Sequence, residues 1–321
     1  MKRRRVKNFS QIGLVVLAGL ALGLGAYTYL NSRELKSAEN TRPLLLLPTN
    51  ESLEENSPAP LLSLSDDKLE QSDVFTVVVT NVPKDASVSA TWSDRRYDLF
   101  PIGNKFIAIL GVDAKKAPGK YSLQVAAGTT ALAADIAVAR RAFPITELAL
   151  TPELKEAGYT ASNISSGVTD ENERLNSVLI YTPSPYFKSQ FINPLENIKI
   201  GGGYGNIRKS AVVELQHLGV DLDAPTGTPV YAVNDGAVRL ADTFTNYGNT
   251  IVIDHGVGIF SFYLHLNEFN VVVGEKVAKG EIIGRVGNTG YSLEPHLHFS
   301  VRIRNASVDP LRFIEKANTA F

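Results

Sequence analysis

The chain has 321 residues, of which 44% are hydrophobic and 20% charged, and it contains no cysteine. This composition excludes a disordered chain, a disulfide scaffold, a thiolate zinc finger and a cysteine nucleophile. The formal charge of −1 hides an asymmetry, because residues 1–10 hold five basic side chains and no acid. The other 27 basic and 33 acidic residues sum to −6, and this acidic balance argues against a nucleic-acid partner.

Residues 11–30 are predicted to form a transmembrane anchor. Ile12 to Leu30 is an uncharged run of 19 residues, which as a helix spans roughly 28 Å, close to the hydrocarbon thickness of a bilayer. The basic residues 1–10 form a cytoplasmic segment that orients the helix. A cleaved signal peptide is the alternative reading. We expect a single-pass protein of the inner (cytoplasmic) membrane, with the bulk of the chain after Asn31 in the periplasm or otherwise outside the membrane.

Residues 31–61 have the composition of a linker, rich in Glu, Asn, Ser and Pro. Residues 62–140 are expected to form short strands, because apolar and polar side chains alternate in Val88–Trp92 and in Tyr121–Val125. About seven strands separated by turns predict a small immunoglobulin-like β-sandwich. This region contains no histidine, so we expect a spacer or docking module rather than a catalytic domain.

Residues 141–195 are predicted to be a connector with a short helix. Asp170 followed by Glu173 has the spacing of a capping box at a helix start. Pro183 and Pro185 are expected to end the helix. Its single apolar stripe would consist of Leu175, Val178 and Leu179.

Residues 196–321 are expected to form a β-rich domain that performs the chemistry. Predicted strands alternate with glycine turns in this region. It also contains all five histidines of the chain, which are His217, His255, His265, His296 and His298.

The segment from His296 to Ile303 alternates strictly between polar and apolar residues. In a strand, side chains two residues apart lie on the same face. His296 and His298 would therefore share one face, and Leu297 and Phe299 would point into a core. Two neighbouring imidazoles can bind a metal, or one can bind it while the other moves protons.

A further histidine and a carboxylate stand at His217 and Asp221. If this segment is extended, their side chains also share a face. Two histidines and one aspartate are three protein ligands, which leaves an open fourth position, as in catalytic zinc sites. Another histidine of the set would then handle protons.

The surrounding motifs match a known family in order, spacing and identity over about residues 195–313. They include Gln216–Leu222, Ala224–Ala232, Tyr263–Leu266, Gly287–Gly290 and Pro295–Phe299. This pattern resembles the LytM/lysostaphin-type zinc metallopeptidases, which cut peptide bonds in bacterial peptidoglycan. The resemblance implies a LytM-type peptidase domain at 196–321, behind a small N-terminal β-domain.

The resemblance also implies roles for individual residues. His217, Asp221 and His298 would bind one Zn²⁺ per chain, and His265 and His296 would be the catalytic histidines that hold water and stabilise the oxyanion. His255 receives no chemical role, and no substrate-binding residue is assigned. Glu294 stands where many members have glycine, which bears on substrate preference. Gly205 and Arg208 match a short Gly-x-x-Arg segment that borders the cleft.

Three functions are compatible with these patterns. The first is a membrane-anchored zinc metallo-endopeptidase that hydrolyses peptidoglycan cross-links during cell-wall remodelling. The second is a catalytically silent LytM-type module that binds peptidoglycan or activates another wall hydrolase. The third is a lipoyl-type or sugar-phosphotransfer domain, because the Gly274–Gly284 hairpin also occurs in those barrels. All five key residues are present and the chain is predicted to be exported, so the sequence favours the enzyme. Partners other than peptidoglycan and the membrane are not indicated.

Overall fold

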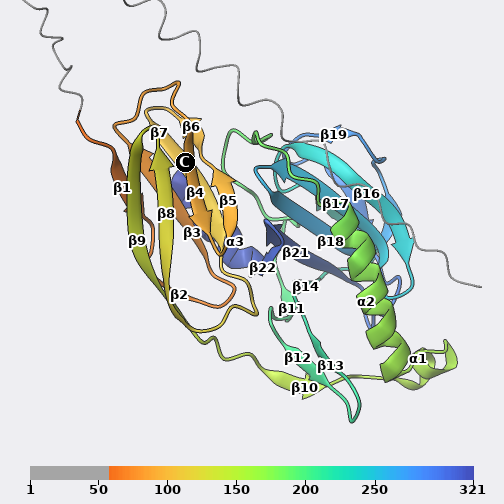
Figure 1. Ribbon diagram of the computed structural model, residues 1–321. Coiled ribbons are helices and arrows are strands. Elements are labelled where there is room, and N and C mark those ends of the chain that lie inside the picture. The colour runs from red at the N-terminus through yellow and green to blue at the C-terminus, as the bar shows by residue number, and fades with distance from the viewer. Residues whose placement is uncertain (1–57) are drawn as a thin grey trace, which may run out of the picture. The chain divides into compact units, whose positions relative to one another are not determined.

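The computed structural model describes residues 58–321 and is mainly β, which confirms the predicted class (Figure 1). The predicted anchor at residues 11–30 and nearly all of the linker at 31–61 lie outside the described residues. Within residues 58–321, none of the helices is both long enough and apolar enough to cross a bilayer.

Residues 61–139 form two sheets. The first has the order β1-β3-β7-β6 and the second β2-β9-β8-β4-β5. Their bounds are β1 Leu61–Leu64, β2 Lys68–Glu70, β3 Val74–Thr80, β4 Val88–Trp92, β5 Arg95–Asp98, β6 Phe100–Ile102, β7 Lys105–Gly111, β8 Gly119–Ala127 and β9 Thr130–Ala139.

An apolar core joins these two sheets. Phe75 of β3 meets Trp92 of β4 edge to face, with ring centroids 5.4 Å apart. The Trp92 indole donates a 3.0 Å hydrogen bond to the Gly111 carbonyl, so its one polar atom is satisfied inside the core. The region has nine strands rather than the predicted seven or so, and its immunoglobulin-like type stays a prediction.

The connector contributes one strand and two helices, β10 Ile145–Glu147, α1 Pro152–Glu156 and α2 Ala161–Ser177. The predicted helix start near Asp170 is wrong, because α2 begins nine residues earlier. Thr160 is the N-cap and forms a capping box with Asn163. This capping box has an asparagine where the prediction relied on a glutamate. Serines and a glycine also interrupt the apolar pattern in the first turns of α2.

A ten-stranded sheet forms most of the C-terminal region. Its main order is β11-β14-β21-β18-β17-β16-β19. In addition, β20 pairs with both β15 and β18, and β22 pairs with β21. The bounds are β11 Ile200–Gly202, β14 Val220–Asp223, β15 Pro229–Tyr231, β16 Gly236–Phe244, β17 Gly248–Gly256, β18 Ile259–Phe269, β19 Lys276–Val277, β20 Ile282–Val286, β21 His296–Ile303 and β22 Ala306–Val308.

The remaining elements flank this sheet. A small sheet joins β10 of the connector to β12 Ile207–Lys209 and β13 Glu214–Gln216. The chain ends in α3 Pro310–Ala317 and the short 3-10 helix η1 Asn318–Ala320.

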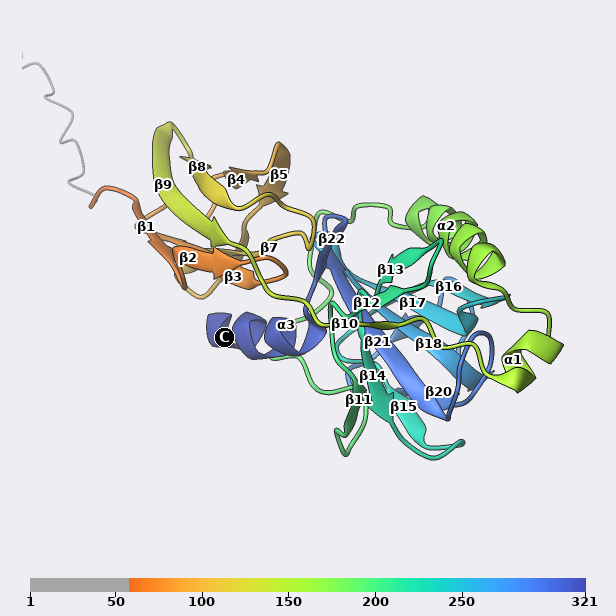
Figure 2. The same cartoon turned by 90° about the horizontal axis from the view of Figure 1, so that it is seen from below.

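The helix α2 covers one face of the large sheet (Figures 1 and 2). On β18, Phe262 and Leu264 pack with Leu175 of α2. In the β18–β21 pairing, Leu264 lies opposite His298. Because directly paired residues of an antiparallel ladder project to the same face, His298 lies on the face that α2 covers.

Candidate metal centre

Strand pairing brings two of the predicted metal ligands together. Asp221 on β14 lies opposite His298 on β21, so both side chains project to the same face. The polar and apolar alternation of β21 is as predicted, because Leu297 and Phe299 are fully buried on its other face. Residues from two strands distant in sequence thus meet at one point.

His217 also reaches this point, but not along one extended strand with Asp221 as predicted. Residues four apart on one extended strand are about 13 Å apart, yet His217 Nε2 lies 2.9 Å from Asp221 Oδ1. His217 follows β13, and the chain bends at Gly219 before β14 begins at Val220. Gly219 permits the close approach of this segment to His298, because a Cβ atom there would lie 2.3 Å from His298 Nε2.

Three potential ligand atoms form a tight triangle. His217 Nε2, Asp221 Oδ1 and His298 Nδ1 are separated by 2.9, 2.9 and 3.0 Å. Tetrahedral zinc with bonds of about 2.0–2.1 Å holds its ligand atoms about 3.3 Å apart. An outward shift of a few tenths of an ångström would accommodate the ion, so this donor set fits zinc.

Neighbouring groups orient two of these ligands. His217 Nδ1 lies 3.0 Å from the Gly203 carbonyl, which can only accept, so the ring proton is on Nδ1 and the Nε2 lone pair is free. Arg208 donates a 2.9 Å hydrogen bond to Asp221 Oδ2, which leaves Oδ1 facing the imidazoles. Such outer partners fix the geometry of metal ligands.

The protonation states suit a cation. Burial raises the pKa of Asp221, but the adjacent His217 and His298 outweigh this effect and hold that pKa well below its usual range. Burial lowers the pKa of His298 to about 4. Asp221 is therefore ionised and His298 neutral at pH 7, as metal coordination requires.

A backbone irregularity turns His265 toward the cluster. His265 has a positive φ of 61°, rare for a residue with a side chain. On β18, Tyr263 and Leu266 pack in one core while Leu264 packs in the other. The bulge therefore reverses the alternation and puts His265 on the same face as Leu264.

His265 and His296 flank the metal triangle. Their ring centroids lie 4.8 Å apart. Each Nδ1 lies 2.8 Å from a carbonyl, that of Thr289 for His265 and that of Glu294 for His296, so both Nε2 lone pairs are free. Burial, followed by the charges of His296 and His298, lowers the pKa of His265 to about 3, which keeps this imidazole neutral.

His255 does not belong to this cluster. Its Nδ1 lies 2.8 Å from the Asp235 carbonyl and its Nε2 2.7 Å from Ser261 Oγ, and the side chain is fully buried. Both ring nitrogens are thus satisfied within the fold, which is the structural arrangement that the sequence reading expected.

Comparison with known proteins gives the family. The model of peptidase family M23 matches residues 215–310, which contain all five histidines. This segment belongs to peptidase family M23. The glycyl-glycine endopeptidase ALE-1 of Staphylococcus capitis is 42% identical over 130 residues, which are 38% of this chain and 35% of that protein. The peptidoglycan DD-endopeptidase ShyA of Vibrio cholerae is 41% identical over 96 residues, 30% of this chain and 22% of that protein.

The M23 segment is thus a minor part of those relatives, and this chain spans about a third of their length or less. A crystal structure of a peptidase M23 protein from Pseudomonas aeruginosa covers more of the chain. It aligns with a TM-score of 0.56 over 75% of this chain and 93% of its own, at 24% identity. At that identity the likeness concerns the fold, which extends well beyond the M23 segment itself.

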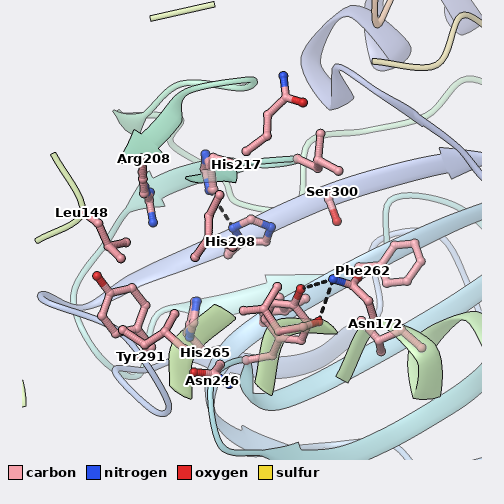
Figure 3. A pocket seen from close by; sticks show the side chains of 18 of the residues that line it. Leu148, Asn172, Arg208, His217, Asn246, Phe262, His265, Tyr291, His298 and Ser300 are labelled. Carbon is pink, nitrogen blue, oxygen red and sulfur yellow. Dashed lines mark hydrogen bonds between the residues drawn. The ribbon is translucent and has the colours of Figure 1, made fainter. Parts of the chain in front are cut away.

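A small cavity adjoins the metal triangle of the M23 domain (Figure 3). Its lining includes His217, His265 and His298 from the M23 domain and Ile164 and Asn172 from α2. The sequence reading missed the contribution of α2 entirely. No signal in the sequence indicated that the connector packs against the histidines, because a helical pattern does not show which other element the helix packs against.

Proposed function

We propose that this chain is a zinc-dependent endopeptidase that hydrolyses peptide cross-links of bacterial peptidoglycan. The observation that supports it most strongly is the convergence of His217 Nε2, Asp221 Oδ1 and His298 Nδ1 to within 3.0 Å of one another. The relatives named as glycyl-glycine and DD-endopeptidases give the substrate class. These two names specify different bonds, so we propose a peptide bond of the cross-link without specifying which one.

His217, Asp221 and His298 would hold the metal, with Arg208 fixing the carboxylate. When bound, zinc supplies a Lewis acid for the scissile carbonyl and acidifies water. The carboxylate and neutral imidazoles present there match the ligand preferences of this ion.

His265 and His296 would move the protons. The Nε2 of His265 is an available base, because its other nitrogen is engaged with Thr289 and burial keeps the ring neutral. An imidazole that has accepted a proton becomes a donor, which can stabilise negative charge on the carbonyl oxygen or protonate the leaving amine. The pair could therefore serve both halves of an amide hydrolysis.

We also propose that residues 11–30 anchor the protein in the inner membrane, with residues 31–61 as a linker and residues 62–140 as an immunoglobulin-like spacer. The uncharged run preceded by basic residues supports the anchor. Membrane fractionation together with N-terminal sequencing tests it. A mature N-terminus near residues 22–34 would show cleavage instead.

The silent-module alternative requires loss of a key residue, and all five are present and brought together. Digestion of purified sacculi with the full-length protein in detergent, followed by mass spectrometry of the released muropeptides, tests the enzyme. We expect new muropeptides with one cleaved cross-link, which also identify the bond. Sacculi that stay intact with zinc-loaded protein would favour the silent module.

A further inference from the structure

A second pocket lies where residues 61–139, the connector and the M23 domain meet, and we call it the junction pocket. Its volume is about 200 Å³. None of the five residues assigned to the metal centre lines it, so it is a separate site. Its lining includes Arg95 of β5, Tyr181 of the connector, and Gly258, Phe260, Arg304 and Asn305 of the M23 domain.

The parts of the chain that form the junction pocket are packed against one another. All described residues belong to one compact unit. Phe100 of β6 meets Phe187 of the connector edge to face, with ring centroids 5.5 Å apart. The Tyr181 hydroxyl donates a 2.9 Å hydrogen bond to Asp98 Oδ2 of β5. The fold itself therefore holds the walls of the pocket in place.

Two arginine side chains converge on this pocket. Arg95 donates a hydrogen bond to the backbone carbonyl of Arg304, so the two residues are in direct contact. The Arg304 guanidinium lies over the ring of Tyr181, with its Cζ 4.1 Å from the ring centroid. Burial raises the pKa of Tyr97 to about 12, and the charges of Arg95 and Arg304 oppose this rise. Both positive charges thus act on the same small region.

The structure supplies no anion to balance these charges. Among the residues that it describes, no carboxylate lines the junction pocket or forms an ion pair with Arg95 or Arg304. The nearby carboxylate of Asp98 is engaged elsewhere, since Oδ1 accepts from Arg96 at 3.0 Å and Oδ2 accepts from Tyr181. Two neighbouring cations without an acid between them attract an anionic ligand.

The backbone holds Arg304 in an unusual conformation. Arg304 and Asn305 form the turn between β21 and β22 and have positive φ angles of 50° and 66°. Asparagine and glycine suit such turns best, so the turn itself does not explain an arginine at this position. In the turn between β17 and β18, a Cβ atom at Gly258 would lie 2.5 Å from Arg304 Cδ. Glycine there leaves the space that the arginine side chain occupies.

The chemistry of the junction pocket suits a carboxylate. A guanidinium presents parallel N–H donors that match the two oxygens of this group, and the side-chain amide of Asn305 can add a further donor. Leu179 and Phe260 provide an apolar wall. Sites for ligands of drug size usually measure about 300–1,000 Å³. The smaller volume here fits a carboxylate together with the short apolar group beside it.

The junction pocket is remote from the metal triangle. Arg304 follows His298 by six residues, and β21 extends as far as Ile303. At about 3.3 Å per residue, this separation is about 20 Å along the strand. A group bound in the pocket therefore cannot belong to the bond that is cut.

We propose that the junction pocket binds a carboxylate of a peptidoglycan stem peptide, with Arg95 and Arg304 as the anion-binding residues. This inference rests on the proposed function, because the peptides of that polymer supply the carboxylate. The bound stem belongs to a part of the wall about 20 Å from the scissile bond. Residues 61–139 thus contribute to substrate binding through Arg95, in addition to their role as a spacer.

Binding of a soluble peptide tests the junction pocket. A synthetic stem peptide without a cross-link is compared with the same peptide after amidation of its carboxylates, by calorimetric titration of the full-length protein in detergent. We expect the free peptide to bind at least about tenfold more tightly, because amidation removes hydrogen bonds between charged groups. Equal affinities for the two peptides would overturn the proposal.

Two variants assign this preference to the junction pocket. Arg95→Gln and Arg304→Gln should each weaken binding of the free peptide about tenfold and leave binding of the amidated peptide unchanged. Arg96→Gln is the matched control, since Arg96 is the next residue of β5 and pairs with Asp98. Arg95 is exposed, so Arg95→Gln remains informative if Arg304→Gln fails to fold. A full preference for the free peptide in Arg95→Gln would contradict the assignment.

Inorganic phosphate identifies a different occupant. The same titration is performed with phosphate alone, using the natural protein and Arg95→Gln. If phosphate binds in a manner that depends on Arg95 and the free peptide does not bind, the pocket is a phosphate site and the proposal is wrong. Displacement of the bound peptide by excess phosphate would support a shared oxyanion site.

Hydrolysis of sacculi separates the junction pocket from the peptidase proposal. Arg95→Gln should raise KM about tenfold while kcat changes less, because the pocket binds polymer away from the reacting bond. If the peptide binds through Arg95 but sacculi are never cut, the pocket stands and the peptidase function fails. If sacculi are cut and KM is the same in Arg95→Gln and Arg96→Gln, the peptidase function stands and the pocket is wrong.

Discussion

The two sheets of residues 61–139 and the large sheet of the M23 domain are built from similar alternating strands, but they bury different side chains. Among the described residues, every buried carboxylate and imidazole lies outside the first region, and these are Glu171, His217, Asp254, His255, His265 and Asp309. The first region buries only apolar side chains and a few hydroxyls, such as that of Thr76.

This difference lies in how each region deals with the cost of burying ionisable groups. Burying an ionisable group has a free-energy cost unless it is paired or neutral. In the M23 domain that cost is offset by specific partners, such as the Ser261 hydroxyl for His255 and the Thr289 carbonyl for His265. Among the described residues, no carboxylate or imidazole of the first region is buried, and its strands can be explained by packing alone.

The largest expected effect concerns His265. His265→Ala should lower sacculus hydrolysis about 10²–10⁴-fold while zinc content is unchanged, because the role proposed for this histidine is to move protons and not to bind the metal. Lys120→Ala, an exposed change on β8, should leave the rate unaffected. Hydrolysis rates and metal content are measured on the same preparations. Similar rates of sacculus hydrolysis for His265→Ala and Lys120→Ala would contradict the assignment of the chemistry to the M23 domain.

The next effect separates a structural histidine from the cluster. Burial lowers the pKa of His255 to about 4, and an unfolded histidine titrates near about 6.5. The unfolded chain therefore takes up the proton first, so the folded state should lose stability as the pH falls below about 6.5. The loss levels off below about pH 4 and amounts to about 3 kcal/mol.

Urea unfolding at pH 7 and pH 5 measures this loss. His255→Asn removes the titrating group and should show a flatter dependence of unfolding free energy on pH than the natural chain. Comparison of the two slopes cancels the contributions of the other histidines. Identical slopes would mean that His255 is not held neutral in the fold.

Arg208 provides a smaller effect at the metal triangle. Arg208→Ala removes the hydrogen bond to Asp221 Oδ2 and should weaken zinc binding about 10–100-fold, as is usual for an outer partner. Arg208→Lys retains the charge and should lie between the two. Competition with a chelating dye gives the affinities. Equal zinc affinity in all three proteins would show that Arg208 does not position the carboxylate.

The smallest effect is expected in the first region. Arg96 pairs with Asp98 at 3.0 Å, and their side chains are 61% and 38% exposed. Exposed pairs of this kind contribute less than about 1 kcal/mol, so Arg96→Ala should change neither hydrolysis nor unfolding by more than that. A larger loss of activity would show that this region takes part in the chemistry.

The sequence predicted a great deal of this fold and site, but only where local pattern determines structure. The alternation from His296 to Ile303 predicted the buried face of β21, and the resemblance to a known family implied the five residues that the structure gathers. The bulge at His265 and the bend after His217 were not predicted, since both depend on how strands pair across the sheet. The length of α2 and its place over the cleft depend on tertiary contacts, which periodicity does not contain.

The most direct test of the metal centre is the zinc content of the full-length protein. We expect about one equivalent per chain in the natural protein, and none above background in His217→Ala, because two remaining ligands hold zinc poorly. His255→Asn should keep its zinc, since that residue lies outside the triangle. Unchanged zinc in His217→Ala, or no zinc in the natural protein at pH 7, would contradict the assignment of His217, Asp221 and His298.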